Sequence, residues 1–448
     1  MPRPSRLLRK HLLPTLLALG ASVSVHSQSL VDLYTAARAY DASYQSARLQ
    51  YDASLAKAEQ ARALLLPTAG LTVNASQIYQ DTLSPAAAAK AYGYASQQAR
   101  LGVSQPLDRP ANKASVEQGM KQIDLAQAQL LVAEQDLIVR VSQAYFDMLA
   151  AADSLAFVKS QKLAVAEQLA SAKRNFEVGT STITDSREAQ ARFDLVVAQE
   201  LAAENDLRVK SIALDQLVGK QSASPKPLRA PAALAGLEPN NIDKWVQDAQ
   251  ATHPGIKQLE IALEVAKLET QKAQAGHKPT LDLTGSYSAL NFSNGTSTAA
   301  NIDSRTNQAS VGLSFSLPLF AGFAVQNRVR ETLALEDKAR SDLEATSRGV
   351  AQGTRTAFFG VQSGLAQVKA LEAAEVSSQS ALDANKLGYQ VGVRINIDVL
   401  NSQSQLFDTK AKLAKARYDV LVGGLKLRQA AGLLKADDLQ PINNQLAQ

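Results

Sequence analysis

The chain has 448 residues, a formal net charge of +5 and no cysteine. The lack of cysteine excludes disulfides and thiolate metal sites, and it leaves no cysteine for N-terminal lipidation. Only 5% of the residues are aromatic, and Ala, Gln, Leu, Ser and Lys fill long stretches without helix breakers. This bias favours long helices over a set of compact domains.

Residues 1–27 have the pattern of a secretory signal peptide. Four basic residues lie within the first ten positions, and an apolar stretch from Leu12 to Val25 follows them. That stretch is shorter than the ~20 residues of a spanning helix, which disfavours a membrane anchor. Removal of the signal lowers the net charge from +5 to +1 because it carries four basic and no acidic residues. A nearly neutral mature chain gives no support for a nucleic-acid partner.

The mature sequence contains an internal duplication at an offset of 212 to 213 residues. The segment "LLLPTAGLTV" at Leu64 corresponds to "GHKPTLDLTG" at Gly276. The same offset relates Pro106 to Pro318, "AYF" at 144–146 to "AFF" at 357–359, Gly179 to Gly392, Asp185 to Asp398, and Gly219 to Gly432. A constant register over these landmarks predicts two structural repeats.

Each repeat has the same predicted order of elements. The first repeat, residues 28–220, is expected to hold a helix from Leu30 to Leu65, strands at 68–80 and 96–107, and helices at 110–178 and 184–218. The second, residues 242–435, is expected to hold a helix from Ile242 to Ala275, strands at 280–291 and 308–320, and helices at 322–390 and 396–432. A proline-rich linker at 221–241 joins them, and residues 436–448 form a C-terminal tail.

The predicted strands alternate apolar and polar residues. In the segment 308–317, Ala309, Val311, Leu313, Phe315 and Leu317 alternate with Gln308, Ser310, Gly312, Ser314 and Ser316. Alternation alone fits a half-buried soluble sheet as well as a membrane barrel. Runs of 10 to 12 residues suit tilted membrane strands of ~9–11 residues, and polar loops separate the paired strands, which favours the barrel. Four strands cannot close a barrel, so three copies would supply twelve.

The longest predicted helix begins near Ala111 and reaches Val178 with no proline and one glycine, Gly119. At 1.5 Å per residue, ~68 helical residues extend ~100 Å. Its apolar positions include a series spaced by seven residues: Leu125, Val132, Val139 and Phe146. Such a stripe predicts coiled-coil neighbours.

Several stretches resemble the TolC family of bacterial outer-membrane exit ducts over nearly the whole mature chain. These are "ARALLLP" at Ala61, "GHKPTLDLT" at Gly276, "VGLSFSLPLFAG" at Val311, and the turns "EVGTSTITD" and "QVGVRINIDVL". The resemblance implies a mainly α fold with membrane β-strands, in which a homotrimer forms a twelve-stranded barrel in outer-membrane lipid and continues as an α-helical barrel through the periplasm of a Gram-negative bacterium. It also implies two partners, a periplasmic adaptor (membrane fusion) protein and an inner-membrane pump of the ABC or proton-driven type.

The two repeated turns are predicted to reverse long helices. Gly179 and Gly392 supply the left-handed conformation that ends a helix. Thr184 and Asp185 are the predicted N-cap residues after the first turn, with Glu188 completing a capping box. Asn396 or Asp398 is the predicted cap after the second. These features alone explain both stretches as ordinary hairpin turns.

The resemblance implies a further role for the turns, as the periplasmic constriction of a trimer. Three copies of Asp398 would form a selectivity ring, with Asn401 one turn further on the same face. Close relatives carry a second aspartate at the position of Asn401, so cation binding should be weaker here. The implied gate contacts pair Arg394 with Asp185, and Tyr389 with the region of Thr184.

The sequence therefore predicts a passive exit duct for type I protein secretion, multidrug efflux or both. The missing lipidated cysteine slightly favours protein export. The alternative is a periplasmic coiled-coil adaptor or structural protein. We expect no enzymatic activity, because paired carboxylates without a surrounding pocket are weak evidence for catalysis. We also expect no cofactor and no metal, since His253 and His277 are isolated in the mature sequence.

Overall fold

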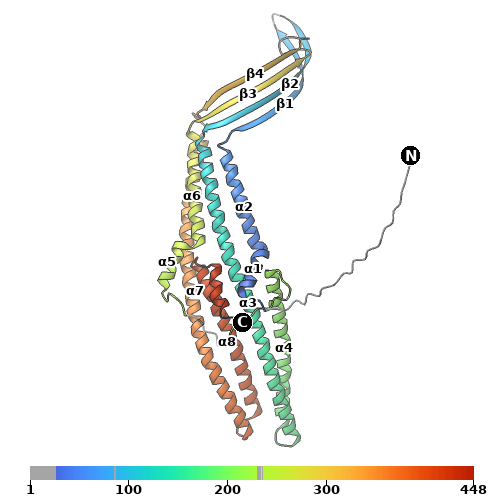
Figure 1. Cartoon of the computed structure of the whole chain (residues 1–448), viewed down its shortest axis with the longest axis vertical. Coiled ribbons are helices and arrows are strands. Elements are labelled where there is room, and N and C mark those ends of the chain that lie inside the picture. The colour runs from blue at the N-terminus through green and yellow to red at the C-terminus, as the bar shows by residue number, and fades with distance from the viewer. Residues whose placement is uncertain (1–26, 85–86, 230–233, 235, 448) are drawn as a thin grey trace, which may run out of the picture.

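The structure is a computed structural model that describes residues 27–84, 87–229, 234 and 236–447. The predicted signal peptide therefore lies outside the described residues, apart from Ser27. Figure 1 shows an elongated molecule with its strands gathered at one end and its helices running away from them.

The elements follow the duplicated order. The first repeat holds α1 (Leu30–Tyr40), α2 (Ala42–Ala63), β1 (Thr68–Ser84), β2 (Ala87–Asp108), α3 (Pro110–Glu177) and α4 (Ile183–Val218). The second holds α5 (Ile242–Thr252), α6 (Pro254–Gln274), η1 (Ala275–His277), β3 (Thr280–Ser293), β4 (Ser304–Ser316), α7 (Ala324–Gln390) and α8 (Asn396–Ala430). Two short elements end the chain, η2 (Ala436–Asp438) and α9 (Leu439–Asn443).

The first helix of each repeat is broken, where the sequence predicts one continuous helix. The breaks fall at Asp41 and His253, which are related by the duplication offset. The carboxylate of Asp41 accepts the backbone N–H of Tyr44, and Nδ1 of His253 accepts the N–H of Gly255. Pro254 has no N–H and disfavours helical backbone at His253, whose ψ is 122°. Both side chains therefore begin a new helix at the same place in each repeat.

The four strands form one antiparallel sheet in the order β1-β2-β3-β4. One row across it contains Leu71, Leu101, Tyr287 and Ala309. The apolar face of this sheet is open, with Leu71 69% and Val311 84% exposed. Each of the outer strands, β1 and β4, has a strand neighbour on one side only. The sheet thus presents an apolar face and two unpaired edges.

The bounds of β1, β2 and β4 differ from the sequence prediction in an instructive way. β1 and β2 continue past the predicted 68–80 and 96–107, since Tyr79 pairs with Gly93 and Asp81 with Ala91. Backbone ladder bonds do not need alternating side chains, so pairing outlasts the apolar pattern. β4 ends at Ser316 rather than at residue 320, two residues before Pro318, which lacks the N–H that a ladder needs.

The helices lie in a single layer. Near the sheet the contacts follow the order α2-α3-α6-α7, and further away they follow α4-α3-α8-α7. The main core lies at mid-length, where Leu33, Ile138 and Tyr145 are fully buried together with Leu439 of α9. The predicted linker and tail contribute to it: Tyr145 Oη donates to the carbonyl oxygen of Lys226 at 2.8 Å, and the backbone of residues 227–229 bonds to that of residues 445–447.

Within the described ranges, none of the helices combines the length and the apolar character that crossing a bilayer requires.

Candidate functional site at the hairpin turns

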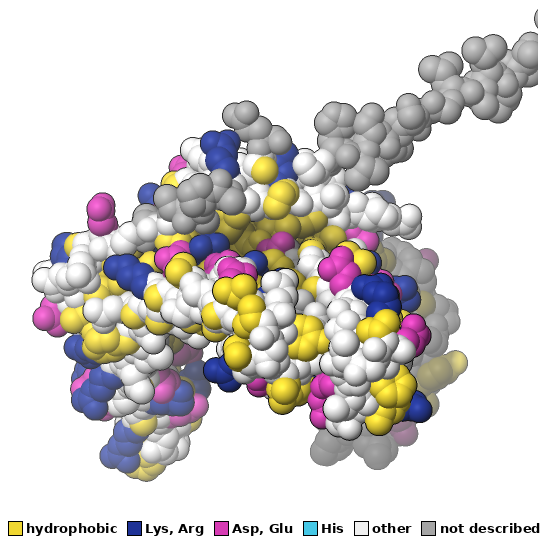
Figure 2. Space-filling view, turned by 90° about the horizontal axis from the view of Figure 1, so that it is seen from below, with side chains coloured by type: hydrophobic (Ala, Val, Ile, Leu, Met, Phe, Trp, Pro, Cys, Tyr) yellow, Lys and Arg dark blue, Asp and Glu magenta, His cyan; other side chains and the backbone are white. Residues whose placement is uncertain are grey.

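The two predicted turns lie at the end of the molecule that is furthest from the sheet. Figure 1 places the α3–α4 turn and the α7–α8 turn together at the lower end. Figure 2 views this end, and basic and acidic side chains are interspersed there with neutral and apolar ones. The charges are therefore mixed at this end, so the charge around each residue depends on its immediate neighbours.

Both turns use the same backbone device. Gly179 and Gly392 have φ of +77° and +80°, in the left-handed region that favours glycine. The N–H groups of Gly179 and Thr180 bond to the carbonyl oxygens of Phe176 and Asn175. The equivalent bonds join Gly392 to Tyr389 and Val393 to Gly388. This is the Schellman arrangement, which satisfies the last carbonyl groups of α3 and α7.

A capping box fixes the start of α4, although its N-cap is Thr182 rather than the predicted Thr184 or Asp185. Thr182 Oγ1 accepts the N–H of Asp185 at 3.3 Å, and Asp185 Oδ2 accepts the N–H of Thr182 at 3.0 Å. Asp185 thus holds the third helical position of the box, and Glu188 has no part in it. The predicted cap lay too far along the chain, because the turn after Gly179 is two residues shorter than expected and α4 begins earlier.

The second turn lacks this cap. The N-cap of α8 is Ile395, which has no side-chain acceptor, so neither Asn396 nor Asp398 caps the helix as predicted. Asp398 holds the position equivalent to Asp185. Its Oδ2 lies 3.7 Å from Nη1 of Arg394. The carboxylate that completes the cap in the first turn therefore pairs with a neighbouring arginine in the second.

Polar contacts join the two hairpins close to their tips. Asn175 Nδ2 donates to Tyr389 Oη at 3.2 Å, and Arg192 Nη2 donates to Asn401 Oδ1 at 2.6 Å. The fully buried Asn396 accepts from Gln168 of α3 and donates to the carbonyl oxygen of Asp185 at 3.5 Å. The two hairpins are thus joined within one chain by amide, hydroxyl and guanidinium groups.

The gate pairs implied by the resemblance are not formed within this chain in the described residues. The acidic partner of Arg394 is Asp398 instead of Asp185, because these two lie one helical turn apart. Tyr389 does reach the first hairpin, but at Asn175 instead of Thr184, whose side chain is exposed on α4. Asn401 is held by Arg192.

Three residues that join the hairpins were not predicted from the sequence, namely Asn175, Gln168 and Arg192. Each carries a polar side chain on a helix face that otherwise packs on a neighbour, and the apolar cluster of Val165, Leu169 and Leu400 lies beside them. A polar residue that interrupts an apolar stripe was the available signal. Without the partner helix, such a residue looks like part of a solvated face.

The family model described as "Outer membrane efflux protein" matches residues 33–220 and 245–433, which span nearly all of both repeats. The chain belongs to this family. The two matched segments coincide with the two structural repeats, and the resemblance to TolC-family ducts is thereby confirmed.

Among curated relatives of the outer membrane efflux protein family, the chain is 32% identical to outer membrane protein TolC of Vibrio cholerae over 97% of this chain and 98% of that protein. It is 30% identical to the alkaline protease secretion protein AprF of Pseudomonas aeruginosa, over 92% of this chain and 86% of AprF. The solved Campylobacter jejuni CmeC outer membrane channel superposes with a TM-score of 0.79 at 15% identity, covering 99% and 98% of the two chains.

These likenesses confirm the predicted fold class and location. The chain is an outer-membrane channel protein of the efflux and secretion type, and it extends from the outer membrane into the periplasm. Its family and structural relatives are channels rather than enzymes.

A Tyr–Asp pair between the hairpins has a structural role in the scaffold of this protein. Tyr418 Oη of α8 donates to Asp153 Oδ2 of α3 at 2.6 Å. Burial raises the pKa of Asp153, and the hydrogen bond from Tyr418 opposes that rise. Burial and the adjacent Asp153 raise the pKa of Tyr418 as well. This hydrogen bond links α3 of the first repeat to α8 of the second, beside the main core that contains Tyr418.

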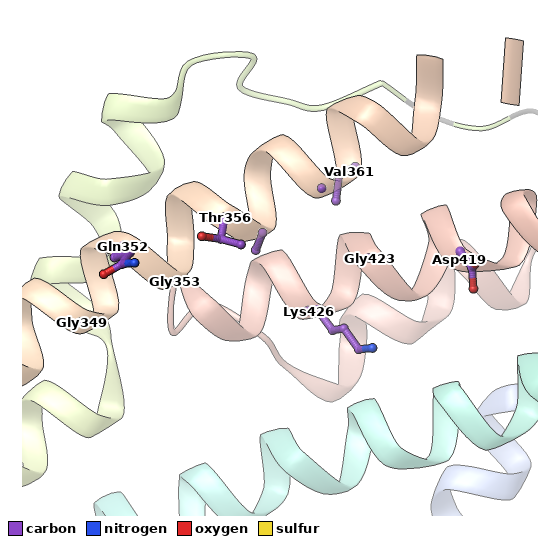
Figure 3. Close-up of a pocket in the computed structure, with 10 residues that line it drawn as sticks. Gly349, Gln352, Gly353, Thr356, Val361, Asp419, Gly423 and Lys426 are labelled. Atoms are coloured by element: carbon purple, nitrogen blue, oxygen red, sulfur yellow. The ribbon is translucent and has the colours of Figure 1, made fainter. Parts of the chain in front are cut away.

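The hollow of about 570 Å³ in Figure 3 lies between α7 and α8. Backbone and small residues wall it, including Gly349, Gly353 and Gly423. Its charged residues are already engaged, since Lys426 donates to Gln143 and Asp419 pairs with Lys415. No group of three or more His, Asp or Glu residues in the described part of the chain is placed to hold a metal ion. The tips remain the better candidate site.

Proposed function

We propose that this protein works as a homotrimer, a passive exit duct through the outer membrane that opens at its hairpin tips. The observation that carries the proposal is the pair of unpaired edges at β1 and β4 beside an exposed apolar face. Unpaired backbone groups in lipid cost several kcal/mol each, so the edges need partners. Three copies supply twelve strands, an even number that closes an antiparallel barrel.

The helical layer supports the same assembly. Its outer members are α2 and α4 on one side and α7 on the other, so the open sides of the helices match the open edges of the sheet. Exposed apolar residues lie on these outer helices, among them Leu201 of α4 and Val376 of α7. A neighbouring copy would cover them and continue the wall of a hollow helical tube.

The duplication predicts how neighbouring copies pair. β4 is the repeat equivalent of β2, and β1 is the equivalent of β3. Within the chain Arg100 of β2 pairs with Ser288 of β3. Applying the offset of 212 to both residues pairs Gly312 of one copy with Ser76 of the next. Both lie on the polar face of the sheet.

Cysteine cross-linking tests this trimer directly because the chain has no native cysteine. Gly312→Cys with Ser76→Cys should give a disulfide-linked trimer in outer-membrane fractions under mild oxidation. The matched control replaces Ser76→Cys with Thr72→Cys, four residues along the same strand, and should remain monomeric on denaturing gels. Recovery of the protein only as a soluble monomer would refute the duct.

We place the gate at the tips. In the trimer, Asp398 and Asn401 would form the constriction around the axis. Arg394 and Asp185 of neighbouring copies would pair across it, with Tyr389 and Thr184 beside them. Arg394 is well suited because its ion pair with Asp398 is long, at 3.7 Å, and 58% of the arginine side chain is exposed. An exposed pair of this kind is weak and exchanges partners at little cost.

Single-channel recordings in planar bilayers test the gate. Arg394→Gln and Asp185→Asn should each raise conductance, and Asp398→Asn should lower cation selectivity. Asp383→Asn is the matched control, since Asp383 is exposed and, among the described residues, its side chain accepts a hydrogen bond from Gln379 of its own helix and from no residue of another helix. Unchanged currents in all three variants would leave the tips as plain hairpin turns. A protein that opened no pore would instead favour the adaptor or structural alternative.

The duct would act with a periplasmic adaptor (membrane fusion) protein and an inner-membrane pump of the ABC or proton-driven type, which open the tips and supply the energy. It would need no catalytic residue or cofactor of its own. The name of the relative AprF, an alkaline protease secretion protein, supports protein cargo. Deletion of the gene should remove proteins from the culture medium if the cargo is protein, and it should raise antibiotic sensitivity if the cargo includes drugs.

A further inference from the structure

Arg100 lies in the middle of the polar face of the sheet. Backbone pairing places it in one row with Thr72, Ser288 and Gln308. The adjacent row on one side of it holds only Gly and Ser residues: Gly70, Gly102, Ser286 and Ser310. The adjacent row on the other side holds Asn74, Gln98, Leu290 and Thr306. Most apolar residues of the strands, such as Leu71, Leu101 and Val311, lie on the opposite face, so Arg100 faces the water-filled interior if the strands form a barrel.

Glycines hollow the sheet surface beside Arg100. A hollow of about 520 Å³ is lined by Gly70, Gly102 and Arg100 together with hydroxyl side chains. A Cβ added at Gly70 or Gly102 would meet no atom within 4 Å, so the space above the backbone is open. Across the hollow, the hydroxyl groups of Ser286 and Ser310 lie 2.9 Å apart. The guanidinium group therefore projects over a surface of small residues and hydroxyl groups.

No carboxylate in the described part of the chain forms an ion pair with Arg100. At the base of this face the described acidic groups are already paired, since Asp282 binds Arg109 through two hydrogen bonds of 2.6 and 2.7 Å, and Asp108 pairs with Lys113. A free guanidinium group offers five N–H donors to an anion. The positive charge of Arg100 is thus available to solutes.

The geometry points to a new role for Arg100, which rests on the proposed trimeric duct: we propose that three copies form an anion-attracting ring inside the barrel, a weak site for carboxylate, phosphate or chloride. The duplication puts Gly312 at the equivalent position of the second repeat, so the barrel carries three such charges rather than six. The ring lies in the membrane-spanning part, four residues from the pair Thr68 and Ser104 near the lower end of β1.

Twelve tilted strands spaced ~4.8 Å apart give a barrel about 24 Å across. The strand backbone is then about 12 Å from the axis, and the inward-pointing charges lie no further away than that, which is close to the Debye length of ~10 Å at 0.1 M salt and well inside the ~30 Å at 0.01 M. Simple Coulomb estimates at about 12 Å with this screening favour chloride over potassium by about threefold at 0.1 M and about tenfold at 0.01 M, and charges nearer the axis favour chloride more strongly. The ring would oppose the cation preference expected from Asp398 at the other end.

The test is the reversal potential of the full-length channel under KCl gradients in planar bilayers. Arg100→Gln should shift the permeability ratio toward potassium, by about threefold or more at 0.1 M and about tenfold or more at 0.01 M. Arg100→Lys keeps the charge and should behave as the wild type. Arg305→Gln is the matched control, because Arg305 lies in the row of Ala75, Gln97 and Asn291 on the opposite face.

An Arg100→Gln ratio equal to the wild-type ratio at both salt concentrations would overturn the inference, and so would an equal shift in Arg305→Gln. A conducting wild type combined with an unchanged variant rejects the ring alone. A wild type that opened no pore would reject the proposed duct and the ring with it.

Discussion

The turns at Gly179 and Gly392 reverse their helices with the same backbone bonds but start the next helix differently. After the first turn, Thr182 and Asp185 satisfy each other's N–H groups. After the second, Ile395 occupies the cap position, and Asp398 lies beside Arg394. The aspartate is at the same helical position in both. Because the second turn has Ile395 where the first has Thr182, the carboxylate of Asp398 takes no part in a cap and can form other contacts.

This difference separates folding from function in the duplicated unit. The glycines and Schellman bonds reverse the chain in both repeats, so neither Asp185 nor Asp398 is needed for the reversal itself. In the first tip, the carboxylate of Asp185 stabilises the start of α4 by accepting the N–H of Thr182. The second tip lacks a cap worth about 1 kcal/mol, and its carboxylate can form the charged contact that we propose at the constriction.

The largest effect should come from the shared part of the two turns. Gly179→Ala and Gly392→Ala should each lower the free energy of local opening by about 1–2 kcal/mol, since an L-residue is strained in the left-handed region. Hydrogen-exchange mass spectrometry of the tip peptides measures this. Gly349→Ala, within α7 and facing open space, should instead be neutral or stabilising. Unequal losses at the two tips would show that the turns are not equivalent.

The cap should give the next effect, and only at the first tip. Thr182→Ala should cost about 1 kcal/mol in the local stability of α4, because the N–H of Asp185 loses its acceptor. Ile395→Ala is the matched substitution at the second tip and should change the opening of α8 by a few tenths of a kcal/mol at most. Equal losses in the two variants would contradict the proposed contrast.

A gain of about 0.5–1 kcal/mol should follow from installing the missing cap with Ile395→Thr. Ile395 already has extended backbone, with φ −100° and ψ 161°, and Asp398 is in position to complete the box. Exchange at the start of α8 should slow. The proposed gate predicts a simultaneous loss of cation selectivity, because the new threonine would engage Asp398. Slower exchange with an unaltered selectivity would separate the cap from the constriction.

The smallest effect should come from the ion pair at the second tip. Its members are one turn apart and partly exposed, which limits their coupling energy to about 0.3–0.5 kcal/mol. A double-mutant cycle of Arg394→Gln and Asp398→Asn, read out by local exchange, measures this term. A coupling above 1 kcal/mol would indicate that the pair stabilises the tip and would weaken its assignment to the gate.

The fold was largely predictable because the duplication repeats every landmark and the long helices lack breakers. The turn glycines were predictable too, since few residues adopt positive φ at a helix end. The break at Asp41 was not, because a side-chain cap inside an apolar pattern resembles a helical residue, whereas Pro254 was an available signal for the break at His253. Tip contacts such as Arg192 with Asn401 depend on the packing of helices 209 residues apart in sequence, and no local pattern encodes that packing.

The C-terminal segment has a consequence for biogenesis. Asn443 of α9 accepts the N–H of Val31 across 412 positions, and Leu439 and Leu446 are buried beside α1. The mid-length core therefore cannot close until the last residues have been synthesised and have crossed the inner membrane. Such long-range contacts slow folding. A chain that stays unfolded until its last residues arrive remains competent for transport, and it completes its core only in the periplasm.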